Sequence, residues 1–115
     1  MPYTLTKFTD TSITSKHEIK LNVYPAIGGS GLVLVNTDSG HNQEFYDKKS
    51  TFTYLILQGS GTFFLNDEEV SIEEGDMLSI PPMTKIYYKG KLKMILLTTP
   101  AWKAENEVET RSKFW

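Results

Sequence analysis

The sequence predicts a small all-β protein, and three observations carry that prediction. Short runs of β-branched, aromatic and aliphatic residues recur at the spacing that is typical of a β-sandwich or barrel. Glycine, proline, asparagine and aspartate cluster between these runs, where turns are expected. With 115 residues, 39% of them hydrophobic, the chain is long enough to bury one core and too short for two. We therefore predict a single domain over residues 1–115.

The candidate strands follow one another with little helix between them. They span residues 19–24, 31–35, 52–57, 62–65, 69–72, 77–80, 85–89 and 92–98. The run Gly59-Ser60-Gly61 indicates a sharp turn, and residues 66–68 indicate a tight hairpin. Pro81 and Pro82 end a strand because proline cannot donate to a β-ladder. The polar stretch 41–50 fits no pattern and stays unassigned.

The C-terminal segment 101–115 is predicted as a short helix or a tail that follows a core barrel of roughly 19–100. Glu107 and Arg111 lie one helical turn apart and would pair in a helix over residues 104–111. A frayed tail is the alternative. The terminal Phe114 and Trp115 indicate that the end of the segment docks on the barrel or on a partner subunit.

Composition excludes several classes of function. The formal net charge is −2, which gives no electrostatic reason to expect nucleic acid or an anionic membrane as a partner. The chain has no cysteine, so disulfides, thiolate metal sites and a cysteine nucleophile are excluded. No apolar run is long enough for a membrane span or a secretory signal. We therefore expect a cytoplasmic protein.

Residues 51–100 contain two runs that resemble the cupin superfamily. The segment YLILQGSG at 54–61 is similar to the strand and glycine turn of the first cupin motif. The segment EGDMLSIPPMT at 74–84 is similar to the second motif. This resemblance implies a double-stranded β-helix, or jelly-roll barrel, with a pocket inside it, and often a homodimer.

The metal ligands of that superfamily are replaced in this chain. The family's metal is held by two histidines and a glutamate of the first motif and by a histidine of the second. By this resemblance, Phe52 stands at the glutamate position and Ile86 at the last histidine position, and residues 45–48 contain no histidine. Apolar side chains offer no lone pair to a cation. We therefore expect no metal and no other cofactor.

Strand alternation predicts which side chains would line the pocket instead. If Phe52 points inward, Tyr54 and Ile56 point inward with it, and Ile86 is joined by Tyr88, whereas Tyr87 faces outward. The full predicted lining is Phe52, Tyr54, Ile56, Ile86 and Tyr88, with Phe63 and Tyr46 nearby. A packed barrel interior explains this set as well as a ligand pocket does, because side chains fill small barrels.

Two further features bear on chemistry and assembly. His41, Glu44 and Asp47 form a weak alternative set for metal binding or acid–base chemistry, although their spacing suits a helix face and a solvated loop is favoured. His17 is expected at the surface. Leu55 and Leu57 would face outward, and an outward apolar stripe indicates a homodimer interface.

Three functions are therefore open at this level. The first is a metal-independent barrel that binds a sugar-like or partly apolar small molecule, or that serves as a scaffold. The second is a metal-independent isomerase or epimerase that uses Tyr54 or Tyr88 as its acid or base, with His41 as a remote candidate. The third is a degenerate metal-dependent enzyme of the dioxygenase or isomerase class, built on His41, Glu44 and Asp47. The sequence names no substrate.

Overall fold

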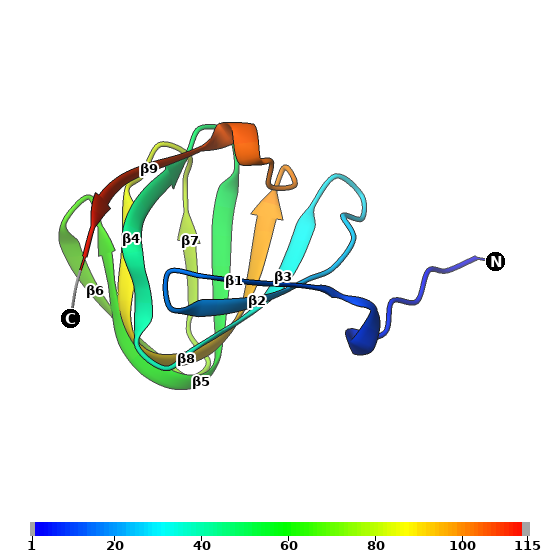
Figure 1. The fold of residues 1–115 in the computed structure, drawn as a ribbon, viewed down its shortest axis with the longest axis horizontal. Coiled ribbons are helices and arrows are strands. Elements are labelled where there is room, and N and C mark those ends of the chain that lie inside the picture. The colour runs from blue at the N-terminus through cyan, green and yellow to red at the C-terminus, as the bar shows by residue number, and fades with distance from the viewer. Residues whose placement is uncertain (1, 114–115) are drawn as a thin grey trace.

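The computed structural model describes residues 2–113 and consists of antiparallel strands curled into a barrel (Figure 1). The strands are β1 (Ser12–Lys16), β2 (Ile19–Val23), β3 (Gly31–Thr37), β4 (Gly40–Asp47), β5 (Thr51–Leu65), β6 (Glu68–Glu73), β7 (Met77–Ile80), β8 (Ile86–Thr99) and β9 (Glu107–Ser112). Two short 3-10 turns, η1 (Phe8–Asp10) and η2 (Ala104–Asn106), complete the described part. The prediction of an all-β barrel is confirmed.

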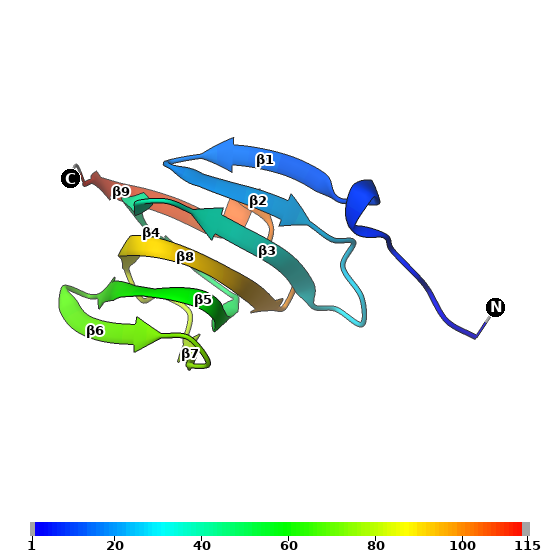
Figure 2. The same cartoon turned by 90° about the horizontal axis from the view of Figure 1, so that it is seen from below.

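The barrel has two layers that share the long strands β5 and β8. In one layer the order is β1-β2-β3, then residues 92–99 of β8, residues 51–56 of β5, and β7. In the other layer it is β9-β4, then residues 86–89 of β8, residues 60–65 of β5, and β6. Figure 2 shows β3, β8 and β5 running side by side. The two layers face each other and enclose the core.

Glycines lie where β5 and β8 bend from one layer into the other. Gly59 has φ +90° and Gly90 has φ +137°, and Gly61 pairs directly with Gly90 across the ladder. A Cβ on Gly59 would collide with the carbonyl oxygen of Lys91. The prediction of a turn at Gly59-Ser60-Gly61 is therefore wrong: the run lies inside β5, next to a register shift between Ile56 and Gln58.

The sheet extends beyond the predicted core barrel at both ends. The C-terminal helix predicted over 104–111 is wrong, because η2 is followed by strand β9, which pairs with β4. The unassigned stretch 41–50 supplies most of β4, and β1 adds a strand before residue 19. The predicted docking of Phe114 and Trp115 lies outside the described residues.

The interior follows the predicted alternation of β5 and β8. Phe52, Tyr54 and Ile56 are buried on β5, as are Ile86 and Tyr88 on β8. With Phe63 they belong to one core cluster, in which the Tyr54 ring meets the Phe63 ring edge-on at 4.9 Å between centroids.

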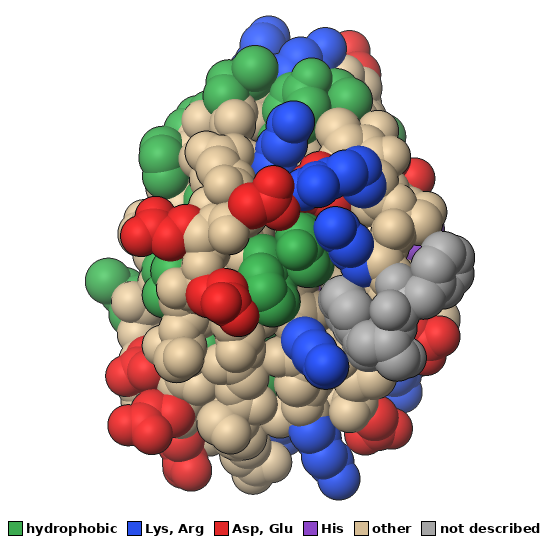
Figure 3. All heavy atoms as spheres, turned by 90° about the vertical axis from the view of Figure 1, so that its left-hand side faces the viewer, with side chains coloured by type: hydrophobic (Ala, Val, Ile, Leu, Met, Phe, Trp, Pro, Cys, Tyr) green, Lys and Arg blue, Asp and Glu red, His purple; other side chains and the backbone are tan. Residues whose placement is uncertain are grey.

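Tyr87 lies on the opposite face of β8 but is covered there. Its ring stacks on Phe64 at 4.5 Å between centroids, and Lys113 Nζ lies 4.9 Å from its centroid. Figure 3 shows the side of the molecule that carries β6 and β9, where acidic and basic side chains surround a small hydrophobic area. Among residues 2–113, no helix is long and apolar enough to cross a membrane.

Candidate active site

A chamber of about 320 Å³ lies between the two layers of the barrel. Its wall is mainly apolar, with residues such as Leu21, Val33, Phe45, Phe52 and Leu96. Polar or polar-tipped side chains also line it, among them Lys16, His41, Tyr54, Tyr88, Trp102 and Glu107. A few convergent polar groups in an apolar cavity are the usual composition of a small-molecule site.

Tyr54 and Tyr88 line this chamber from adjacent strands, with ring centroids 5.9 Å apart. Neither hydroxyl has a hydrogen-bond partner among the described residues, yet neither is sealed: the sole fully enclosed side-chain atom without a partner in that part of the chain is Asp47 Oδ2. Burial raises the pKa of both phenols above the usual value. Both therefore remain O–H donors at neutral pH.

His41 lies on β4 and is 5% exposed. Its Nδ1 accepts a hydrogen bond from the backbone N–H of Gln43 at 3.4 Å. Burial, followed by the positive charges of His17 and Lys16, lowers the pKa of His41 to about 3. The ring is therefore neutral at neutral pH, and because Nδ1 accepts, Nε2 carries the proton. The prediction of a solvated loop at this position is wrong.

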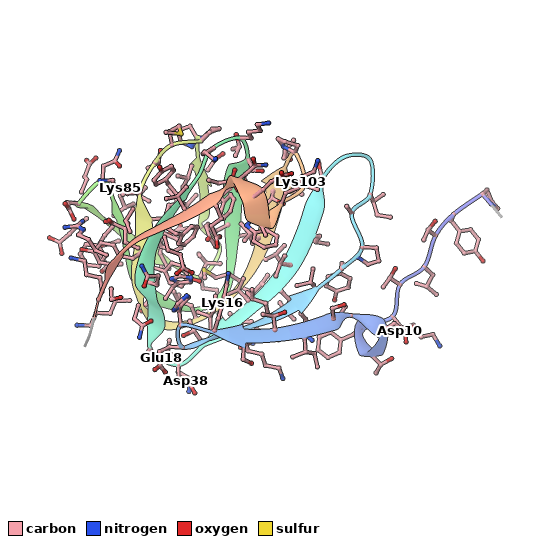
Figure 4. The ribbon with its side chains drawn as sticks, turned by 45° about the horizontal axis from the view of Figure 1, so that its top comes forward. Asp10, Lys16, Glu18, Asp38, Lys85 and Lys103 are labelled. Atoms are coloured by element: carbon pink, nitrogen blue, oxygen red, sulfur yellow. The ribbon has the colours of Figure 1, made fainter. Side chains whose placement is uncertain are left out.

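Lys16, Trp102 and Glu107 form a polar group where β1 meets the segment that leads into β9. Lys16 Nζ lies 3.3 Å from Glu107 Oε2, and Trp102 Nε1 donates to Glu107 Oε1 at 3.2 Å. The ammonium also lies 5.6 Å from the Trp102 ring centroid. Figure 4 shows Lys16 on β1 and Lys103 beside η2. These contacts fix a carboxylate at the wall of the chamber.

A second contact joins β1 and β9 just beyond this group. The His17 ring lies 5.3 Å from that of His41, between centroids, and His17 Nε2 is 3.0 Å from Glu109 Oε1. His17, with 29% of its side chain exposed, lies directly after the end of β1, which agrees with the expected surface position. The seam between β1 and β9 carries no backbone pairing among the described residues, so side chains hold it together.

Glu44 and Asp47 do not join His41. The Glu44 carboxylate is bonded to Arg111, and Asp47 Oδ1 accepts the backbone N–H groups of Lys49 and Ser50 at 2.8 and 2.7 Å. Within residues 2–113, no three His, Asp or Glu side chains gather as a metal site would require. The metal hypothesis built on His41, Glu44 and Asp47 is therefore wrong.

Sequence reasoning found part of the chamber. Of the predicted lining, Phe52, Tyr54 and Tyr88 face it. The others, Ile56, Phe63, Ile86 and Tyr46, are not among its lining residues; the first three are packed in the core. Lys16 and Glu107 were missed, since nothing in their local sequence marks them as neighbours.

Comparison with known proteins gives no matching family model. The chain is 26% identical over 93 residues to an uncharacterized protein of Aquifex aeolicus, covering 81% of this chain and 74% of that one. It is 33% identical to the solved structure of Pac13, described as a unique nucleoside dehydratase, with a TM-score of 0.92 and coverage of 99% of this chain and 95% of that one. Structures of Streptomyces Pac13 variants with uridine are also similar, at 31–32% identity.

More distant structures share the fold alone. Ectoine synthase from P. lautus matches with a TM-score of 0.76 at 12% identity. A protein from Klebsiella pneumoniae with a double-stranded β-helix domain matches with a TM-score of 0.73 at 11% identity. The predicted jelly-roll fold is thus confirmed, and with more than 30% identity over almost the whole of both chains, this protein belongs to the cupin superfamily and, within it, to the family of Pac13.

Proposed function

We propose that this protein binds a nucleoside in the barrel chamber and removes water from it. The observation that carries the proposal is that three side chains lining one chamber have polar atoms without a hydrogen-bond partner within residues 2–113: the hydroxyls of Tyr54 and Tyr88 and Nε2 of His41. Buried polar groups are normally paired, so such a set indicates a polar ligand that completes the pairing.

The similarity to Pac13 supports this choice of ligand and reaction. The variants of that protein solved with uridine replace one histidine by glutamine and each of two tyrosines by phenylalanine. The replaced residues are numbered one position beyond His41, Tyr54 and Tyr88 of this chain. The constant offset of one supports the inference that His41, Tyr54 and Tyr88 correspond to the three replaced residues of Pac13. A volume of about 320 Å³ suits a molecule of nucleoside size.

Dehydration needs a base and an acid, and the chamber offers both. The reaction breaks a C–H bond and a C–O bond on neighbouring carbons and forms a C=C bond. Glu107 is the only carboxylate among the described residues that line the chamber, and we assign it as the base that takes the carbon-bound proton. Its two oxygens are oriented by Lys16 and Trp102.

The acid must hold a proton at neutral pH and deliver it to the departing hydroxyl. Tyr54, Tyr88 and His41 Nε2–H all meet this requirement, because burial keeps both phenols protonated and His41 donates through Nε2. One of them protonates the hydroxyl, which leaves as water. The proton that Glu107 took from carbon is then transferred to this acid, which restores both groups for the next turnover. This scheme replaces the isomerase or epimerase hypothesis with an elimination that uses the same tyrosines.

The experiment combines binding and turnover. Uridine is titrated into the purified protein by calorimetry, and a panel of nucleosides and their oxidised derivatives is then screened by mass spectrometry for loss of one water. Tyr54→Phe, Tyr88→Phe and His41→Gln are compared with Tyr46→Phe, a matched control at a tyrosine outside the chamber. We expect at least one chamber variant to lower kcat roughly a hundredfold and the control to leave it unchanged.

Two results would change the proposal in different ways. Uridine binding that the chamber variants weaken, with no dehydration of any panel member, would leave a nucleoside-binding protein. Absence of both binding and turnover in the wild type would overturn the nucleoside assignment. The cytoplasmic location and the homodimer remain predictions from the sequence.

A further inference from the structure

Glu44 is a wholly buried carboxylate outside the chamber, with 0% of its side chain exposed. Arg111 on β9 binds it with two nitrogens, Nη2 to Oε2 at 2.6 Å and Nε to Oε1 at 3.0 Å. Thr110 donates its hydroxyl to Oε1 at 2.7 Å. The arginine bond is the main reason that the pKa of Glu44 lies below its usual value, against the opposing effect of burial. The carboxylate is therefore charged and saturated with donors.

This ion pair lies at an irregularity of β4. The register of β4 with β8 shifts between His41 and Phe45, and its register with β9 shifts between Gln43 and Phe45. Glu44 falls inside both intervals. A β-bulge bends a strand and re-aims its side chains, and such bulges are common beside active sites. Arg111 ties this irregular part of β4 to one position on β9, because its guanidinium binds the Glu44 carboxylate through two nitrogens in one orientation.

The two strands joined here carry opposite parts of the chamber. His41 precedes Glu44 by three residues on β4, and Glu107 precedes Arg111 by four residues on β9. Both His41 and Glu107 line the chamber, whereas Glu44 and Arg111 do not. A slip of β9 by one residue would turn Glu107 away from the chamber, since side chains alternate between the faces of a strand. A buried ion pair is well suited to fixing register.

We propose that Glu44 and Arg111 are the positioning residues of this site, which fix where His41 on β4 and Glu107 on β9 stand relative to each other. The inference rests on the proposed function for its catalytic meaning. The geometric part stands without it, because the placement of His41 can be measured with no ligand present.

The test uses Glu44→Gln, Thr110→Val and the control Asp67→Asn. Glu44→Gln removes the charge that Arg111 binds. Thr110→Val keeps the ion pair but removes the hydroxyl that donates to Glu44 Oε1 and to the Glu44 carbonyl oxygen. Asp67→Asn alters the other contact of Arg111, at 2.8 Å on the exposed side, without touching β4. For each folded variant, the His41 ring is titrated by nitrogen-15 NMR, with Lys16 and His17 as its charged neighbours, and uridine binding is measured by calorimetry.

We expect Glu44→Gln to bring the His41 titration from about pH 3 toward the ordinary histidine range, because a loosened bulge admits water to the ring. Uridine binding should weaken roughly tenfold or more. Thr110→Val should give smaller changes in the same direction, and it serves as the test if Glu44→Gln does not fold. Asp67→Asn should match the wild type.

The outcomes separate the two proposals. A folded Glu44→Gln or Thr110→Val variant with the His41 titration of the wild type would overturn the positioning role. A wild type that does not bind uridine, with a His41 titration that shifts as expected in the variants, would overturn the nucleoside assignment and keep the positioning role.

Discussion

Lys16 Nζ and Glu107 Oε2 lie 3.3 Å apart across the seam between β1 and β9, which is bridged by side chains rather than by backbone pairing in the described part of the chain. The Lys16 side chain is 30% exposed and that of Glu107 14%. A pair of this kind contributes little to folding, roughly 1 kcal/mol or less. Its importance therefore lies in where it holds the Glu107 carboxylate.

Glu107→Gln is predicted to abolish turnover while the protein stays folded. Loss of the base should lower kcat by about a hundredfold or more. Thermal unfolding should change little. Glu109→Gln is the matched control, because Glu109 occupies the same strand and binds His17 but does not line the chamber. Equal activity of the two variants would remove Glu107 from the mechanism.

Stability should fall with acid because His41 is buried as the neutral form. The pKa of His41 is lowered from 6.5 to about 3, so between these values the unfolded chain binds a proton that the folded chain does not. The free energy of unfolding should decrease as pH falls from about 6.5 toward 3, by up to about 5 kcal/mol. Urea unfolding across this range measures the slope.

His41→Gln supplies the control for that slope. The variant lacks the titrating ring, so its unfolding free energy should vary less between pH 6.5 and 4 than that of the wild type. Below this range, protonation of the Glu44 carboxylate lowers the free energy of unfolding further in both proteins, because the pKa of Glu44 is also lowered in the folded state. Parallel slopes in the two proteins down to pH 4 would contradict the buried neutral state of His41.

Gly59→Ala should destabilise the barrel more than Gly75→Ala. Both glycines have φ close to +90°, so both substitutions carry the same backbone strain, about 1 kcal/mol. A Cβ at Gly59 would also collide with the Lys91 carbonyl, whereas a Cβ at Gly75 meets nothing within 4 Å. The difference in unfolding free energy should be at least about 1 kcal/mol. Equal losses of unfolding free energy in the two variants would show that the bend of β5 tolerates a side chain.

The outer face of the β3-β8-β5-β7 layer is predicted to mediate self-association. Leu55 pairs with Met77 and with Ile95 across the sheet, and Leu55 and Met77 are 38% and 69% exposed. Adjacent exposed apolar side chains of this kind are typical of interfaces. Met77→Lys should convert a dimer into monomers in light scattering, with thermal stability of the fold retained. Glu73→Lys, outside the layer, should leave the dimer intact. A monomeric wild type would end the prediction.

The sequence predicted the architecture more completely than the site, for a physical reason. Tyr54 and Tyr88 could be placed inside the barrel because the cupin resemblance sets Phe52 and Ile86 inward and alternation along a strand is a local pattern. Strand β4 escaped detection because its buried His41, Glu44 and Asp47 read as a solvated loop. Their burial depends on partners distant in sequence, such as Arg111, 67 residues further along.

Two other predictions, the C-terminal helix and the turn at residues 59–61, failed for similar reasons. Glu107 and Arg111 are spaced for a helix as well as for a strand, and pairing with β4 decided between them. Gly59 and Gly61 indicate backbone freedom, which serves a turn and a bend within a long strand equally well.

The side-chain seam between β1 and β9 has a consequence for how substitutions act on this barrel. Strand ladders elsewhere in the barrel are held by main-chain groups that every residue except proline supplies, so they persist through most substitutions. At the seam, Lys16, His17, Glu107 and Glu109 set the polarity and width of the rim by their identity alone. Substitutions at these four positions should therefore alter the entrance to the chamber while leaving the strand ladders in place.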